Sequence, residues 1–330
     1  MKALALVLAA LLAAVPAWAE LAPGSMDMQW AAGARDCAKD PQPPLQVHAY
    51  DPRTFILRES LCSTFEAPFM YLLIGSRRAL LIDTGDVADP TRMPLAKTVL
   101  SLLPGAAMKL PLLVVHTHRH LDHRAGDPQF AHLPGVQVVG YDLASVRAYY
   151  GFNHWPNGLA QIDLGDRTID VMPTPGHNET EVSFYDRSTG LFFSGDFMLP
   201  GRLLIDDTQA AIASADRVAK FVSAQPVSFV LGGHIETDAE GNLFSWGSSY
   251  HPNEHVLQLS RADLLALPAA LRSFNGIYTT RGKLVMMNSM RVLMIEAAAL
   301  LLILGGLVTL LVRIIRRWRR GRQLRAGAPG

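Results

Sequence analysis

The sequence predicts an α/β sandwich in which two sheets pack together and helices cover them. Short apolar segments with the composition of β-strands recur in both halves of the central region, and segments of helical character lie between them. Polar residues that can bind a metal follow the ends of several of these strands, which is where α/β folds place their sites. With 330 residues, the chain is long enough for one large domain and additional terminal segments.

The first half of the central region is expected to hold five strands and two helices. The strands are expected at 54–58, 70–74, 79–82, 112–115 and 136–140, and the helices at 94–103 and 142–150. A turn at 75–78 joins the second and third strands, and Asp142 is the expected N-cap of the second helix. The loop 151–158 is rich in aromatic residues, Gly and Pro, and it either covers a pocket or is an ordinary connector.

The second half continues with four strands and one helix. The strands are expected at 168–172, 182–185, 191–193 and 227–231, and the helix at 210–224. The second and third of these strands form a hairpin around the turn 186–190. No internal repeat is visible in the sequence.

The N-terminus is typical of a secretory signal peptide. A positive start at residues 1–2 is followed by an uncharged apolar stretch at 3–15 and an A-x-A cleavage site that ends at Ala19. An N-terminal anchor helix is disfavoured, because the apolar stretch is short for a bilayer and ends at Pro16. The residues that follow, 20–45, are polar and aperiodic and are expected to form an extended lead-in.

Near the C-terminus, an apolar stretch predicts a transmembrane helix. Residues 292–312 are interrupted only by Glu296 and match the roughly 20 residues that a helix needs to cross a bilayer. A buried core helix is the alternative, but the stretch lacks an amphipathic face. Seven arginines follow it within 13 residues: Arg313, Arg316, Arg317, Arg319, Arg320, Arg322 and Arg325. By the positive-inside rule the tail is cytoplasmic and the preceding domain lies on the far side, as the signal peptide also requires.

Charge and cysteine content restrict the partners and the kinds of metal site. Without Lys2 and the seven arginines, 22 basic residues face 29 acidic ones, so no nucleic-acid partner is expected. The arginine run is a candidate nucleic-acid tail as well, but its position beside the membrane favours a role in topology and contact with anionic lipid. Cys37 and Cys62 are the two cysteines, and an exported chain can oxidise them to a disulfide. Neither has CxxC spacing, so histidines and carboxylates must supply the metal ligands.

A run of histidines directly behind an apolar strand indicates a metal site. Within six residues it contains four candidate ligands, His118, His120, Asp122 and His123. A single histidine in such a place is more often a hydrogen-bonded core or surface residue, but four at this spacing reverse those odds.

The candidate ligands are spread along the chain but share one position relative to the strands. Each lies just past the end of an apolar strand, and these residues are Asp83, the group around His118, His177, Asp196 and His234. Glycines beside three of them, at 176, 195 and 232–233, let the backbone turn tightly and approach a bound ion.

Through these residues the chain resembles the metallo-β-lactamase superfamily. The five ordered motifs correspond to Asp83 in LIDTGD, T-H-x-H-x-D-H at 117–123, His177, Asp196 and His234, and the resemblance covers roughly residues 45–240. It implies an αββα sandwich of the metallo-β-lactamase type. It also implies that the first metal is held by His118, His120 and His177, and the second by Asp122, His123 and His234. Asp196 would bridge both metals, and Asp83 would orient a ligand from outside.

The resemblance implies a metal-dependent hydrolase with a small-molecule substrate. Two divalent cations about 3.5 to 4 Å apart can share a hydroxide, which Asp122 is placed to orient while it accepts or passes on a proton. The ions are expected to be Zn²⁺, with iron or manganese as alternatives. The bridging Asp196 is similar to that of glyoxalase II-like enzymes, which favours an ester, thioester, lactone or phosphodiester. Because β-lactamases of the superfamily have Cys or Ser at this position, β-lactam hydrolysis is secondary, and so is a non-catalytic metal-binding protein.

Four further residues depart from the family pattern. Glu179 and Glu181 place two additional carboxylates near the expected site, where they are either solvated loop charges or groups that repel anionic substrates. His251 and His255 lie beyond the five motifs and either line the pocket or belong to a surface loop.

The predicted organisation places one catalytic domain on the outer face of a membrane. The segments are a signal peptide at 1–19, a lead-in at 20–45, a hydrolase domain at 46–290, a transmembrane helix at 291–313 and a basic tail at 314–330. The expected location is a bacterial inner membrane, with the domain in the periplasm and the C-terminus in the cytoplasm.

Overall fold

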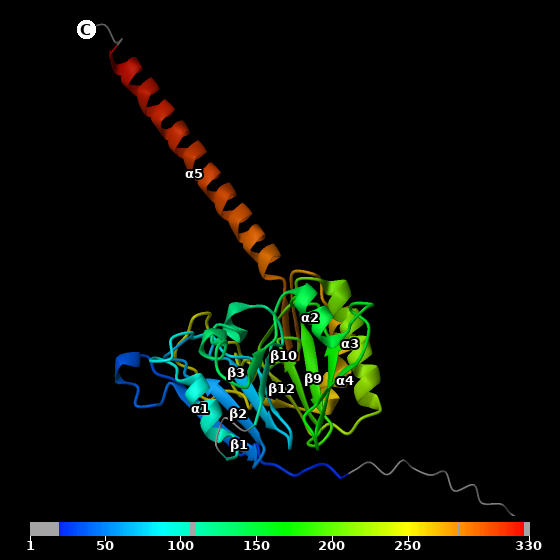
Figure 1. The fold of residues 1–330 in the computed structure, drawn as a ribbon. Helices are drawn as coiled ribbons and strands as arrows, with labels where there is room; N and C mark the ends of the chain where they lie inside the picture. Colours follow the sequence, from blue (N-terminus) through cyan, green and yellow to red (C-terminus); the bar gives the residue numbers. More distant parts are fainter. Residues whose placement is uncertain (1–19, 106–109, 283, 327–330) are drawn as a thin grey trace, which may run out of the picture.

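Two six-stranded sheets pack face to face in the computed structural model, which describes residues 20–105, 110–282 and 284–326 (Figure 1). The first sheet contains, in spatial order, β1 (Leu45–Asp51), β2 (Thr54–Glu59), β3 (Phe69–Ile74), β4 (Ala79–Ile82), β5 (Leu112–Val115) and β6 (Val136–Val138). The second contains β13 (Gln258–Leu259), β12 (Phe229–Gly232), β10 (Leu191–Gly195), β9 (Val182–Asp186), β8 (Thr168–Pro173) and β7 (Ala160–Asp163). Both sheets mix parallel and antiparallel pairs, and the predicted sandwich is confirmed.

Helices cover the outer faces of both sheets (Figure 1). The helices of the domain are α1 (Leu95–Leu102), α2 (Leu143–Tyr150), α3 (Thr208–Ser223) and α4 (Arg261–Arg272), with short 3₁₀ turns η1 (Cys37–Lys39), η2 (Leu121–His123) and η3 (Asp127–Gln129). A fifth helix, α5 (Ser289–Ala326), follows the domain. The N-caps follow from the sequence. Asp142 accepts a hydrogen bond from the Ser145 N–H, as predicted, and Ser260 forms a capping box with Asp263.

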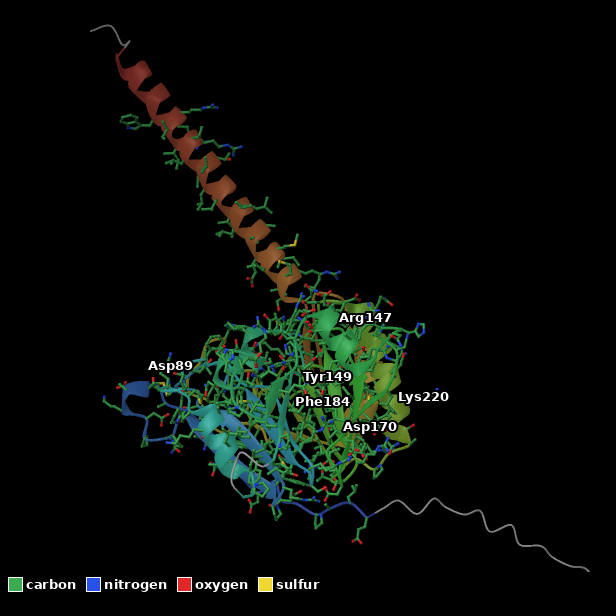
Figure 2. All side chains as sticks on the ribbon, viewed as in Figure 1. Asp89, Arg147, Tyr149, Asp170, Phe184 and Lys220 are labelled. Atoms are coloured by element: carbon green, nitrogen blue, oxygen red, sulfur yellow. A yellow bond between two sulfur atoms is a disulfide. The ribbon has the colours of Figure 1, made fainter. Side chains whose placement is uncertain are left out.

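Three layers of apolar side chains hold these elements together. Between the sheets, the rings of Tyr71 and Phe193 lie 4.6 Å apart, and Phe184 is fully buried among them (Figure 2). The first sheet packs against Val99 of α1, and the second packs against Val218 of α3 together with side chains of α4. Each such side chain contributes about 1.5 to 3 kcal/mol by leaving water, which makes the two sheets a rigid base for the loops at their ends.

A third sheet, which the sequence did not predict, connects the sandwich to the C-terminal helix. It contains β11 (Arg202–Leu204), β15 (Leu284–Met287) and β14 (Tyr278–Arg281), in the order β11-β15-β14. The parallel pair β11 and β15 places Leu204 opposite Met287. Asn288 closes the junction by donating its side-chain amide to the carbonyl of Ile205, and α5 begins at the next residue. The strand before α5 is therefore part of the folded domain.

The helix α5 extends away from the sandwich as a single rod, with its side chains surrounded by open space (Figures 1 and 2). Its segment Ser289–Trp318 is long and apolar enough to cross a membrane, and Leu301 and Leu302 are 69% and 78% exposed. The predicted transmembrane segment 292–312 lies within it. The predicted signal peptide at 1–19 lies outside the described residues.

The lead-in is extended and is attached to the domain by a disulfide. Cys37 in η1 is bonded to Cys62 in the loop between β2 and β3, with Cα atoms 5.2 Å apart. An isolated bridge pairs Gly33 with Tyr250, so the lead-in also contacts the loop 244–251. Three residues after this loop lies Glu254, whose carboxylate accepts two hydrogen bonds of 2.7 Å from the buried Arg58 of β2.

The ion pair between Arg58 and Glu254 generates a stability prediction. Glu254→Ala leaves the guanidinium of Arg58, which is 1% exposed, without its counter-ion. The variant should therefore lower the free energy of unfolding, measured by urea denaturation, by about 3 to 5 kcal/mol. The control is Asp216→Ala, which breaks a half-exposed pair with Arg272 and should cost less than about 1 kcal/mol. Equal losses in the two variants would contradict a structural role for the buried pair.

Candidate metal centre

Three imidazoles converge at one end of the sandwich. His118 follows β5, His120 lies two residues further, and His177 follows β8. The Nε2 atoms of His118 and His177 each lie 3.0 Å from Nδ1 of His120. These three side chains could hold one metal ion, and two of them are buried.

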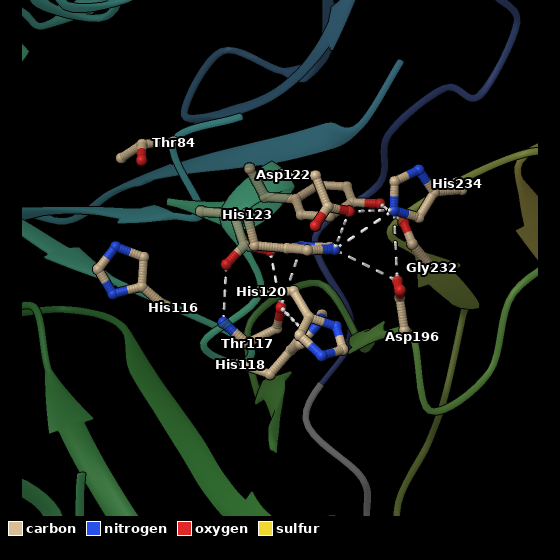
Figure 3. Close-up of polar contacts among 12 residues, drawn as sticks. Thr84, His116, Thr117, His118, His120, Asp122, His123, Asp196, Gly232 and His234 are labelled. Atoms are coloured by element: carbon tan, nitrogen blue, oxygen red, sulfur yellow. Dashed lines mark hydrogen bonds and ion pairs between the residues drawn. The ribbon is translucent and has the colours of Figure 1, made fainter. Parts of the chain in front are cut away.

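A second group of four ligands lies beside the first (Figure 3). Asp122 and His123 come from η2, Asp196 follows β10, and His234 follows β12. The Oδ2 atom of Asp122 lies 3.2 Å from Nε2 of His123 and 3.3 Å from Nε2 of His234. Asp196 reaches both groups, since its carboxylate lies 3.5 Å from His123 Nε2 and 3.6 Å from His177 Nε2. The structure thus brings together all seven residues that the sequence suggested.

Asp83 organises the turn that carries these ligands. Its side chain is fully buried, its backbone has a φ of 65°, and it follows β4, the neighbour of β5. Its carboxylate accepts hydrogen bonds from Thr117 N at 2.7 Å, Thr117 Oγ1 at 2.8 Å and His123 Nδ1 at 2.9 Å. The sequence did not identify Thr117, whose hydroxyl donates to Asp83 and can therefore accept from Nδ1 of His118, 3.2 Å away.

Two further imidazoles are oriented by backbone carbonyls. His177 Nδ1 lies 3.0 Å from the carbonyl oxygen of Leu204 in β11, and His234 Nδ1 lies 2.7 Å from that of Glu66. A carbonyl only accepts, so each Nδ1 carries a proton and donates it, which turns each Nε2 toward the centre. A backbone anchor leaves no side-chain signal in the sequence, so neither contact was predictable.

The protonation states differ between the two groups. Burial lowers the pKa of His118 well below its ordinary value and also lowers that of His120, so both present neutral nitrogens. In the second group burial opposes charge as well, but the carboxylates of Asp196 and Asp122 outweigh it and raise the pKa of His234 to about 10. They also raise the pKa of His123. The imidazoles in turn hold the pKa of Asp122 and Asp196 well below their usual range.

The donor set fits divalent cations. Oδ1 of Asp196 is buried and accepts no hydrogen bond from the described residues, although a buried carboxylate oxygen normally has such a partner. Gly233 is required beside it, because a Cβ at that position would press on this oxygen and on the ring of His123. Imidazole nitrogens and carboxylate oxygens with free lone pairs are the ligands that zinc and similar ions prefer.

The pocket above the ligands has a volume of about 200 Å³. Its remaining lining residues, all missed from the sequence, are Glu66, Leu199, Arg202, Leu204, Glu236 and Trp246. Arg202 pairs with Glu236 at 3.2 Å and lies under the ring of Trp246. Burial raises the pKa of Glu66 to about 7. These residues come from loops and from the three-residue strand β11, which are too irregular or too short to show a period, so no local pattern marked them.

The carboxylates that depart from the family pattern have different surroundings. Glu179 is exposed and pairs with Arg119, as expected for a solvated loop charge. Glu181 is fully buried, and burial together with the neighbouring charge of Asp196 raises its pKa well above the ordinary value. It therefore presents no surface charge to a substrate.

Neither additional histidine, nor any described residue of the loop 151–158, lines the metal pocket. His251 is buried, stacks on Phe244 and hydrogen bonds to Glu254, and it borders a small adjoining cavity. His255 lines two grooves outside the centre. In the loop, Phe152 packs into the core, which is the behaviour of an ordinary connector.

Comparison with known proteins agrees with this geometry. The model of the metallo-beta-lactamase superfamily matches residues 63–234, more than half of the chain. An acyl-coenzyme A thioesterase from Gallus gallus is 26% identical over 59% of the chain and 82% of its own length. A hydroxyacylglutathione hydrolase from Dechloromonas aromatica is 26% identical over 65% of the chain and 74% of its own length. A metallo-beta-lactamase from Pontibacter korlensis, 16% identical, covers 70% of the chain and 100% of its own length with a TM-score of 0.48.

The fold and its histidine and aspartate cluster define a metallo-hydrolase. The chain belongs to the metallo-β-lactamase superfamily.

The protonation of the second group predicts that metal binding releases protons. Because the pKa of His234 is raised to about 10, its imidazole is protonated at pH 7 without metal, and a cation must displace that proton. Apparent Zn²⁺ affinity should therefore rise with pH, by up to about tenfold per unit for each displaced proton. Calorimetry in two buffers of different ionisation enthalpy measures the release. His234→Ala should release fewer protons, and a pH-independent affinity would contradict the prediction.

Proposed function

We propose that this protein is a dinuclear, metal-dependent acyl thioesterase anchored to a membrane by α5. One observation carries the proposal: two candidate ligand groups lie side by side, and Asp196 of the second group lies 3.6 Å from His177 Nε2 of the first, with a buried oxygen that accepts no hydrogen bond from the described residues. A protein that retained the fold without a metal would have no reason to keep this oxygen of Asp196 in place, because a buried polar atom without a hydrogen bond is costly.

In this proposal His118, His120 and His177 hold the first ion, Asp122, His123 and His234 hold the second, and Asp196 bridges them. We propose Zn²⁺ as the ion in both positions. When bound, two such ions would polarise an acyl carbonyl and ionise a water molecule near neutral pH. The outer contacts of the imidazoles, to Thr117, Asp83, Leu204 and Glu66, fix the tautomers that such binding requires.

Asp122 is the side chain suited to proton transfer. It lines the pocket and is about one fifth exposed, whereas Asp83 is fully enclosed. Burial alone would favour its neutral form, but the adjacent imidazoles keep its pKa low, so it is an anion that can orient an attacking water and accept its proton. We propose that it then delivers this proton to the departing thiolate.

An acyl thioester is the substrate class with the best support. The names of the relatives describe hydrolysis of acyl groups carried on coenzyme A or on glutathione, and in both carriers the acyl group is attached to sulfur. The ligand set agrees, because Asp196 stands where β-lactamases of the superfamily have Cys or Ser. Esters and lactones share the same carbonyl chemistry and are the next substrates to test.

The proposed location is an inner membrane of bacterial type, with the catalytic domain on the periplasmic side. The exposed apolar surface of α5 supports the anchor, since a water-soluble helix does not leave a continuous leucine-rich surface uncovered. The arginines that follow support a cytoplasmic tail.

Removing the shared ligand tests the dinuclear assignment. Asp196→Ala should leave the domain folded but lower its metal content and reduce kcat/KM for thioesters by at least about 100-fold, because it removes a ligand of both ions. Metal content is measured by mass spectrometry, and folding by circular dichroism. Asp216→Ala, on the exposed surface, is the control and should behave as the wild type. Full activity of Asp196→Ala would refute the assignment.

A substrate panel tests the proposed class. The full chain in detergent, loaded with Zn²⁺, should hydrolyse acyl-coenzyme A or acylglutathione thioesters with a kcat/KM at least about 100-fold above that for a β-lactam or a phosphodiester, a difference of about 2.7 kcal/mol in transition-state binding. A preference for the β-lactam would overturn the thioesterase proposal and leave the metal assignment intact.

Protease accessibility tests the topology. Protease added outside spheroplasts should digest the region 20–290 and spare an epitope tag placed after the arginine tail. Digestion of the tag with protection of the domain would contradict the proposed orientation.

A further inference from the structure

We propose that the disulfide between Cys37 and Cys62 positions His234, so that it controls the second metal group and leaves the first unaffected. The inference rests on the proposed dinuclear function. Its structural basis is the loop 60–68 between β2 and β3, which carries Cys62 at one point and the carbonyl of Glu66 four residues later.

The carbonyl of Glu66 is the direct link to the metal group. It lies 2.7 Å from Nδ1 of His234 and fixes the tautomer in which Nε2 faces Asp122 and Asp196. If the loop 60–68 shifts, His234 loses both its orientation and the acceptor for its proton. Loss of such an outer partner lowers metal affinity by about 10- to 100-fold.

The first metal group has anchors elsewhere in the fold. His118 is oriented by Thr117 beside β5, and His177 by Leu204 in β11. Neither anchor lies in the loop 60–68 or in the lead-in. A displacement of Cys62 therefore reaches His234 of the second group through the Glu66 carbonyl. It does not displace the residues that orient His118 and His177 of the first group.

The disulfide attaches the loop 60–68 to the lead-in, which in turn contacts the loop 244–251. Cys37 lies at the end of a segment in which Ala34 N–H donates to the carbonyl of Ser249, and Ser249 Oγ donates back to the carbonyl of Ala34. The loop 244–251 carries Trp246, and its ring lies 6.4 Å from that of Phe65 in the loop 60–68. The disulfide thus joins the lead-in to the loop 60–68, and hydrogen bonds and a ring contact join both segments to the loop 244–251.

The remaining contacts of the loop should preserve the fold when the disulfide is absent. Thr64 Oγ1 donates to Asp86, and Phe69 N–H donates to the carbonyl of Gly233 at 2.8 Å. Because the Phe69 contact fixes the end of the loop and the Thr64 contact holds its middle, opening the disulfide should increase the motion of the loop around Cys62 and Glu66 without unfolding the sandwich.

The test uses the full chain in detergent and counts metals directly. The double variant Cys37→Ser/Cys62→Ser and the wild type are loaded with Zn²⁺ and dialysed against graded concentrations of a chelator, and the bound metal per chain is measured. The wild type should retain two Zn²⁺ ions per chain up to one chelator concentration and lose both only above it. The variant should lose one ion at a chelator concentration at least about tenfold lower and retain the other as the wild type does.

The outcomes separate this inference from a general effect on stability. Asp142→Ala removes the N-cap of α2, away from the metal centre, and should change neither ion. Loss of both ions in parallel from the double variant, or no change, would overturn the inference. A wild type that never binds two ions would instead overturn the proposed function. If the variant does not fold, the disulfide of the folded wild type is instead reduced with a phosphine. The phosphine takes up oxygen from water while the disulfide becomes two thiols. The same chelator titration of the reduced protein then shows whether one ion, both ions or neither is lost earlier.

Discussion

The buried carboxylate of Asp83 is the interaction on which both halves of the centre depend. It accepts hydrogen bonds from three donors, the Thr117 amide, the Thr117 hydroxyl and the His123 ring, in a place without access to solvent. A buried anion is tolerated only when its hydrogen bonds are complete. Through the Thr117 hydroxyl its influence reaches His118 in the first group, and through His123 it reaches the second.

The candidate centre lies on rigid strands but contains polar groups whose burial lowers the stability of the fold. The strands β4, β5 and β10, which end beneath it, are buried on both faces, so the residues that follow them begin from fixed backbone positions. The close imidazoles, and the oxygen of Asp196 that accepts no hydrogen bond from the described residues, are unfavourable in this region without a cation. The disulfide and the pair between Arg58 and Glu254 stabilise the chain elsewhere. Such a division, in which strain at a site is offset by the surrounding structure, is typical of functional centres.

Local patterns in the sequence predicted much of the fold and marked the residues that form the candidate metal centre. The strands β4 and β5 were placed at their observed bounds, because short β-branched and leucine-rich runs end at clear polar residues. The seven candidate ligands were marked by their common place at strand ends, and their division into two groups was implied by the resemblance to the superfamily.

What the sequence did not predict depends on contacts between distant residues. The pairing of β11 with β15 joins segments about eighty positions apart, and each strand is too short to show a period. The contacts of Leu204 and Glu66 use main-chain oxygens, which every residue has. The pocket loop with Trp246 has an irregular sequence, and its place near the ligands depends on the lead-in and on Glu254.

The position of β15 determines where the soluble part of this molecule ends. A truncation at residue 283, which would seem to spare the domain, removes the strand that covers β11 and leaves a sheet edge open to aggregation. It also frees the segment whose Leu204 carbonyl orients His177. Asn288, which hydrogen bonds to the Ile205 carbonyl, is the last residue before α5, so the enzyme and its proposed anchor meet without a linker. The strand β11, whose Leu204 lines the pocket, is consequently one strand pairing away from the segment that leads into the proposed anchor.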